Sequence, residues 1–137
     1  LDYYKISDGN VIVSGGLRLN SNLRPLGAKI RPIVGVDIRK SKFNTPNYWS
    51  PADGHGNIYA GLEGDWAVEQ WAVYGGAQFG LPAYGEAGTS WSLSAGAKRW
   101  LTDDVAFSFN LWSMASVRAG VTYRSQSANM MLERFWR

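Results

Sequence analysis

The sequence has no cysteine, which excludes disulfide scaffolds and thiolate metal sites. Only 18% of its residues are charged, against roughly a quarter in ordinary soluble domains. A membrane-spanning helix needs about 18 uninterrupted apolar residues, and the longest apolar run here is far shorter. By contrast, 16 of the 137 residues are glycine and 14% are aromatic. This composition is typical of one ordered domain, residues 1–137, built from tightly turned strands lined with aromatic residues.

The net charge is small, with 14 Lys and Arg against 11 Asp and Glu, giving +3. The basic residues form neither a run nor a helical stripe of the kind that grips a phosphate backbone. We therefore expect no nucleic-acid partner.

Apolar residues recur at every second position through most of the chain, which is the period of a β-strand with two different faces. Between Gly27 and Lys40 the even positions are apolar apart from Lys40 itself, and the odd positions are mostly polar, with Ile33 as the exception. Within the same segment, Pro32 predicts a bulge or an edge-like position because it cannot donate a ladder hydrogen bond. About eight strands are expected: 3–7, 11–20, 27–40, 56–66, 71–80, 89–101, 105–112 and 122–136.

The predicted connections alternate between short and long. Short turns are expected at 21–25, 67–70 and 101–104, longer loops at 41–55, 81–88 and 115–121, and a short hairpin at 7–10. Short turns at one end and longer loops at the other are typical of outer-membrane barrels. The predicted fold class is therefore all-β: an antiparallel up-and-down transmembrane β-barrel, either closed by this chain or forming part of a larger barrel.

The two strand faces favour a barrel in lipid over a soluble one. The polar face carries Gly, Ser, Asn, Gln and Tyr with charges of both signs, as in a wet interior where opposite charges pair. Strands of about ten residues, tilted by about 45°, would cross roughly 24 Å. The alternative is a soluble β-sandwich or lipocalin-like barrel with its aromatic residues in the core. In lipid, an aromatic girdle would comprise Trp66, Trp71, Phe79, Trp91, Phe107 and Trp136.

Residues on the predicted polar face have the character needed to contact a passing saccharide weakly and repeatedly. In a narrow eight-stranded barrel the same residues would instead fill the interior. The candidates for lumen and saccharide contact are Tyr59, Tyr74, Gln78, Asn110, Trp112, Arg18, Arg31, Arg39, Glu63, Asp65 and Lys98.

The sequence also offers two catalytic alternatives. The single histidine, His55, lies near Ser50 and Asp53 and could serve a lipid A-modifying enzyme at the membrane rim. A paired-carboxylate glycosidase would use Glu63 and Asp65, but two acids so placed more often balance nearby arginines. We expect a protein without catalytic residues, metal or cofactor.

Two segments resemble a known family. The motif Asn47–Pro51 (NYWSP) and the C-terminal 123–136 segment are similar to the barrel region of exopolysaccharide export porins. These tetratricopeptide-plus-barrel proteins include the cellulose synthase outer-membrane subunit and the poly-N-acetylglucosamine exporter. The likeness covers about residues 47–136, and Arg137 departs from the family's aromatic terminus.

The resemblance implies a non-catalytic porin wall in the bacterial outer membrane, with about sixteen strands in the whole barrel and this chain as its C-terminal part. It also implies a lipid bilayer with lipopolysaccharide around the barrel, a polysaccharide chain in the lumen, a periplasmic repeat domain and an inner-membrane synthase. The sequence here shows no helical repeat. The alternative is a small closed barrel with a structural or adhesive role, which would use loops 43–55, 82–88 and 116–121.

Overall fold

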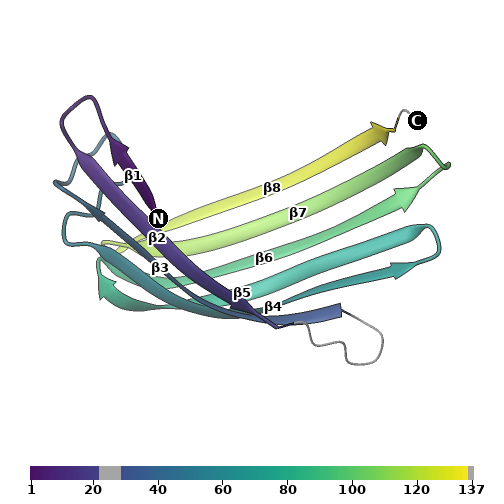
Figure 1. The fold of residues 1–137 in the computed structure, drawn as a ribbon, viewed down its shortest axis with the longest axis horizontal. Coiled ribbons are helices and arrows are strands. Elements are labelled where there is room, and N and C mark those ends of the chain that lie inside the picture. The colour runs from purple at the N-terminus through teal and green to yellow at the C-terminus, as the bar shows by residue number, and fades with distance from the viewer. Residues whose placement is uncertain (22–28, 136–137) are drawn as a thin grey trace.

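The computed structural model describes residues 1–21 and 29–135. These residues form eight antiparallel strands in a single sheet, and each strand pairs with its neighbour in sequence (Figure 1). The fold is therefore all-β and up-and-down, as the alternating pattern predicted. The strands are β1 (Asp2–Lys5), β2 (Val11–Asn20), β3 (Lys29–Ser41), β4 (His55–Val68), β5 (Trp71–Gly85), β6 (Ala87–Trp100), β7 (Val105–Arg118) and β8 (Val121–Arg134).

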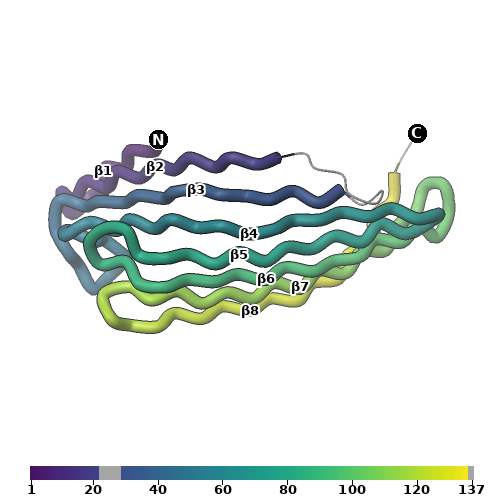
Figure 2. Tube along the Cα trace, turned by 90° about the horizontal axis from the view of Figure 1, so that it is seen from below, coloured from purple at the N-terminus to yellow at the C-terminus, as the bar shows by residue number. Residues whose placement is uncertain are grey.

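The sheet is curved along and across its strands and is open rather than closed (Figures 1 and 2). Its strand order starts at β1 and ends at β8, without a pairing between these two in the described part of the chain. β1 is four residues long and pairs only with Val11–Ser14 of β2. Within the described residues, β8 is therefore one edge of the sheet. The part of β2 that β1 does not cover forms most of the other edge. Among the described residues, a helix that could span a membrane is absent.

The period of two in the sequence gives the sheet two unlike faces. One register row joins Asp65, Tyr74 and Asn110 through Gly96, and the next row joins Gly64, Ala95 and Leu111. Large apolar side chains on the face of this second row are exposed: Leu62 is 56% exposed, Leu93 52% and Leu111 45%. The sheet therefore presents one polar face and one exposed apolar face, and nothing in the described chain packs against the apolar face.

Strands β3 to β8 are longer than the expected ten residues, at 13 to 15 residues each. Fourteen tilted residues reach roughly 33 Å at about 3.3 Å per residue, which exceeds an apolar band of about 25 Å. The strand ends would therefore extend past such a band.

The prediction of a long loop is wrong at two of the three places. In place of a loop over 81–88, β5 continues to Gly85 and β6 begins at Ala87. A register shift at Gly56 and Asn57 keeps Pro82 inside the ladder, and Gly85 turns the chain with a φ of +63°. A bulge and a glycine can thus reverse the chain with one residue between the strands.

The expected loop over 115–121 is also a tight turn. β7 runs to Arg118, and β8 starts at Val121 after two residues, Ala119 and Gly120. Their φ values are +48° and +74°, the left-handed pair that suits a two-residue hairpin. The connection of residues 42–54 between β3 and β4 is the one predicted long loop that the structure retains.

The other predicted connections have mixed outcomes. The turn expected at 67–70 shortens to residues 69 and 70, because β4 and β5 are longer than predicted. The turn at 101–104 and the hairpin near 7–10 are confirmed. Most of the turn expected at 21–25 lies outside the described residues.

Pro32 lies inside β3, and its edge-like position is confirmed while the bulge is not. β3 pairs with β4 without a register shift at this residue. On the other side, pairing with β2 ends at Ile33, and the carbonyl of Pro32 accepts a hydrogen bond from Ser21 N–H at 3.2 Å. In an antiparallel ladder the N–H and C=O of one residue point to the same side. The missing N–H therefore faces the end of the β2 pairing, where it disrupts no ladder.

Candidate functional site

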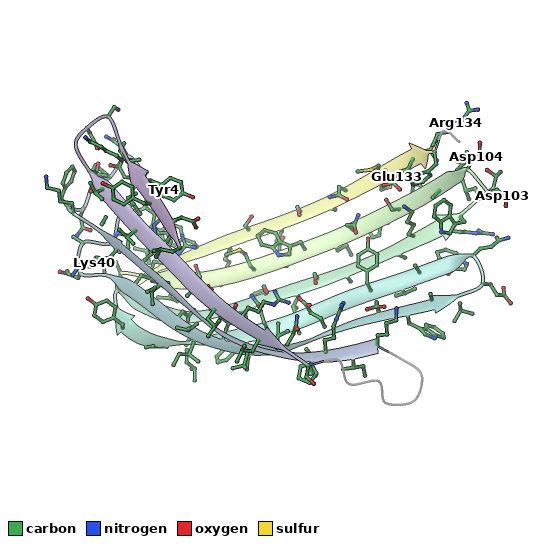
Figure 3. All side chains as sticks on the ribbon, in the orientation of Figure 1. Tyr4, Lys40, Asp103, Asp104, Glu133 and Arg134 are labelled. Atoms are coloured by element: carbon green, nitrogen blue, oxygen red, sulfur yellow. The ribbon has the colours of Figure 1, made fainter. Side chains whose placement is uncertain are left out.

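The polar face lies on the inside of the sheet's curve. Side chains from strands two apart meet on this face. The short side chains of Asn57 and Ser90 bond at 2.7 Å, which requires the sheet to curve towards them because strands two apart in a flat sheet are about 9.6 Å apart. The interactions that skip a strand are Arg18–Glu63, Asn57–Ser90, Tyr74–Asn110 and Lys98–Glu133. Figure 3 shows Glu133, Arg134, Asp103 and Asp104 at the end of the sheet opposite Tyr4 and Lys40.

Small residues on the middle strand make room for these bridges. The bond between Tyr74 and Asn110 passes over Gly96, where a Cβ would overlap the tyrosine ring. The Asn57 to Ser90 bond, at 2.7 Å, passes over Gly80 in the same way. The glycine content of the strands is thus used to let long polar side chains lie flat across the concave face.

The predicted pairing of acids with arginines is found for both acids. Glu63 pairs with Arg18, and Asp65 lies 3.1 Å from Arg31 and 3.5 Å from Lys29. The Arg18 bridge runs across β3 beside Ile33, the exception to the alternation, which is 4% exposed. Glu63 and Asp65 are therefore engaged with cations, as expected for structural charge balance.

The uncharged candidates also lie on the concave face. Tyr74 bonds to Asn110, whose amide donates to Asn129 at 3.0 Å. Tyr59 lies over Gly35, and its ring would overlap a Cβ there. Gln78 and Trp112 line the same hollow on this face, and Trp112 is 38% exposed. Lys98, which pairs with Glu133, lies on the same face. The candidate lumen residues thus share one surface.

The 42–54 loop is fastened to the hairpin between β1 and β2 by Asn10, which is completely buried. The Asn10 amide donates to the carbonyl of Phe43 at 3.0 Å, and its oxygen accepts from Lys42 N–H at 3.2 Å. Inside the loop, the hydroxyl of Ser50 accepts from Thr45 N–H at 2.9 Å. These bonds give the loop a fixed path, which brings Trp49 to the concave face.

The same hairpin and loop share an exposed contact, in which the Tyr48 hydroxyl donates to Asp8 at 2.7 Å. The N–H of Asn10 and this hydroxyl both bind the carboxylate and lower the pKa of Asp8 below its usual value of 3.8. Burial and the Asp8 bond raise the pKa of Tyr48 above 10.0.

We expect Tyr48→Phe to raise the pKa of Asp8 part of the way towards its usual value, because one of the two main donors is lost while Asn10 N–H remains. Ionised Asp8 favours the folded hairpin above its unfolded pKa, and this contribution is lost as pH falls through the lowered folded value. A carbon NMR titration of the Asp8 carboxyl measures the shift. An unchanged titration curve would contradict the role of Tyr48.

Trp49 is the centre of a cationic cluster that sequence reasoning missed. The Arg39 and Arg118 guanidinium groups lie 4.8 and 4.0 Å from its ring centroid, and the His55 ring meets it edge-on at 4.9 Å. Arg39 also donates to the Trp49 carbonyl at 3.3 Å. The alternation places Arg39 on the polar face, but its role in this cluster depends on the fold of the loop. The motif at 47–51 was the one available signal.

A cavity of about 630 Å³ opens beside this cluster on the concave face. His55 lies at its wall but makes no hydrogen bond to Ser50 or Asp53 among the described residues. It packs on Trp49 instead. No group of three or more metal-ligating side chains occurs in the described part of the chain.

Comparison with known proteins gave no match to a family model, to a curated protein or to a solved structure. The function must therefore be argued from the geometry.

Proposed function

We propose that this chain forms part of the wall of an outer-membrane β-barrel through which polysaccharide passes, without catalysing a reaction. The observation that carries the proposal is the apolar face, which is open over the whole sheet while the polar face is cross-linked inside the curve. A contiguous exposed apolar surface of this extent requires a partner or a lipid environment. A soluble sandwich would show the reverse arrangement.

Aromatic residues on the apolar face support the lipid environment. Trp66, Trp71 and Phe107 lie near the end of the sheet that carries the turns at 69–70 and 101–104. Phe79 and Trp91 lie towards the opposite end, which carries the 42–54 loop. On β5, Trp71 and Phe79 are separated by roughly 26 Å along the strand, or about 19 Å across a membrane at a 45° tilt. Two such bands are typical of the interfacial girdles of outer-membrane barrels. The sixth predicted member, Trp136, lies outside the described residues.

The concave face supports the saccharide conduit. Its charges are largely paired within the face, and between them lie amide, hydroxyl and aromatic groups such as Gln78, Ser92 and Trp112. Paired charges do not trap a polymer, whereas hydroxyls, amides and ring faces provide weak repeated contacts. The resemblance at 47–51 and 123–136 points the same way, towards export porins with periplasmic and inner-membrane partners.

Single-channel recording in planar bilayers with the full-length protein tests the proposal. We expect a large open conductance, because in the proposed barrel the polar face lines a water-filled lumen. A barrel that inserts but stays silent would contradict it and would favour the structural or adhesive role.

A matched pair of variants links conductance to this face. Trp112→Ala removes the exposed ring from the concave face and should raise the conductance, since the lumen widens. Ser113→Ala, on the adjacent position of the other face, should leave it unchanged. Equal conductance in the two variants would show that Trp112 does not line the ion path.

A further inference from the structure

Arg39 and Arg118 differ from the other cations of the concave face. Arg18, Arg31, Lys29 and Lys98 each have a carboxylate partner. For Arg39 and Arg118 no ion pair is found in the described ranges. Their Nε atoms, like that of Arg31, are buried without a hydrogen-bond partner. Two guanidinium groups thus lie against one indole ring, and neither has a carboxylate partner in the described ranges.

Buried polar atoms without partners surround the same cavity. His55, Asn57 and Ser116 are 8%, 8% and 6% exposed, and all three line the cavity. His55 Nδ1, Asn57 Oδ1 and Ser116 Oγ each lack a hydrogen-bond partner within the described chain. A buried polar group without a hydrogen-bond partner destabilises the folded protein. Several at one place therefore indicate a site built for a polar ligand.

The cavity has the size of a small-molecule site. Its volume, about 630 Å³, lies within the range of roughly 300–1,000 Å³ found for such sites. A bare inorganic ion would leave most of it unfilled. The remaining wall carries Gln78, Ser90, Ser92 and the ring of Trp112, which suit the hydroxyls and the apolar face of a sugar.

Two acids also line the cavity and restrict the ligand further. Asp37 and Asp2 face the same space from β3 and β1. Neither forms an ion pair in the described residues, so each has lone pairs free to accept from hydroxyl donors. A ligand that matches both the two arginines and the two acids carries an oxyanion at one end and hydroxyl donors at the other.

We propose that the cavity binds a sugar acid, with the carboxylate of a uronate unit between Arg39 and Arg118 and the sugar hydroxyls towards the Asp37 wall. Arginine is suited to this task because its planar fork pairs with a carboxylate through two hydrogen bonds. The site lies at the end of the sheet that carries the 42–54 loop, beside Trp49. The assignment to a saccharide rests on the proposed function, whereas the oxyanion site rests on the two arginines.

Titration calorimetry of the full-length protein in detergent micelles tests the site, with tetragalacturonate as the probe and maltotetraose as the neutral control. We expect tetragalacturonate to bind and maltotetraose to bind at least about tenfold more weakly. Arg118→Gln should weaken tetragalacturonate binding by at least about tenfold. Arg99→Gln is the matched control, because Arg99 also lies over a tryptophan, Trp71 at 5.2 Å, but on the apolar face.

Arg39→Gln is the second variant and should weaken binding to a similar extent, so that the test stands if Arg118→Gln fails to fold. Arg118→Lys should not restore full affinity, since an ammonium group lacks the planar fork. Equal binding of the acidic and neutral probes, or equal weakening by Arg99→Gln, would overturn the proposal. Inorganic phosphate that binds as tightly as the oligosaccharide would overturn the sugar assignment. Conductance is measured separately, so a silent channel with intact uronate binding would reject the conduit and retain the site.

Discussion

If the chain lies in a membrane as proposed, Ala95→Arg is expected to destabilise the inserted protein by roughly 2–4 kcal/mol. Ala95 lies on the exposed apolar face, in the register row of Gly64, Gly75 and Leu111. This row is midway between the two aromatic bands, so in the proposed membrane environment an arginine there would enter the centre of the hydrocarbon region. Alanine has no long side chain to lose, so the cost measures the charge in lipid rather than a cavity.

Ser94→Arg is the control, because Ser94 is the adjacent residue, is also exposed and points to the concave face. An arginine there stays in water and should cost far less. Denaturant unfolding in lipid vesicles gives both free energies. If Ser94→Arg cost more than Ala95→Arg, the apolar face would not be the lipid face, and the proposed function would fail with it.

Not every polar-face position can serve as such a control. Ser108 lies on the concave face of β7 but is 6% exposed, in the register row of Lys98, whose ion pair with Glu133 crosses β7. The sequence pattern alone suggests that an arginine at Ser108 would be tolerated. The structure shows instead that it would have to displace an ion pair.

The strands and their faces could be predicted from the sequence because a period of two is a local property of each segment. Leu62 and Glu63 could be assigned to opposite faces without knowing any neighbour. The turns were harder, because glycine and polar residues near 81–88 suit both a loop and a strand that ends in a bulge. Only the pairing of Asn57 with Pro82 decides between them.

The Trp49 cluster could not be predicted, since its members come from the 42–54 loop and from the ends of β3, β4 and β7. Arg118 was expected in a loop and lies instead at the last position of β7. Its place over Trp49 depends on the tight turn at 119–120 and on the bonds of Asn10 that hold the loop. Such sites arise from long-range packing, which periodicity does not encode.

Gly96→Ala is expected to destabilise the protein by about 1–3 kcal/mol, although it adds one methyl group to a strand. The new Cβ would overlap the ring of Tyr74 and lie 2.7 Å from Asn110 Oδ1. Either the ring moves off the concave face, or the bond between Tyr74 and Asn110 is lost. Gly64→Ala is the matched control on the apolar face, where the nearest atom is the Lys29 carbonyl oxygen at 3.7 Å, and should be neutral or slightly stabilising.

A double-mutant cycle separates the clash from a general intolerance of side chains in β6. In Tyr74→Ala the ring is gone, so adding Gly96→Ala should cost little, and the two changes should be strongly non-additive. Denaturant unfolding of the four proteins measures the coupling. Additive costs would mean that Tyr74 does not lie over Gly96. The strand-skipping bridges would then lose their steric basis, and with them the evidence that the polar face is the inside of the curve.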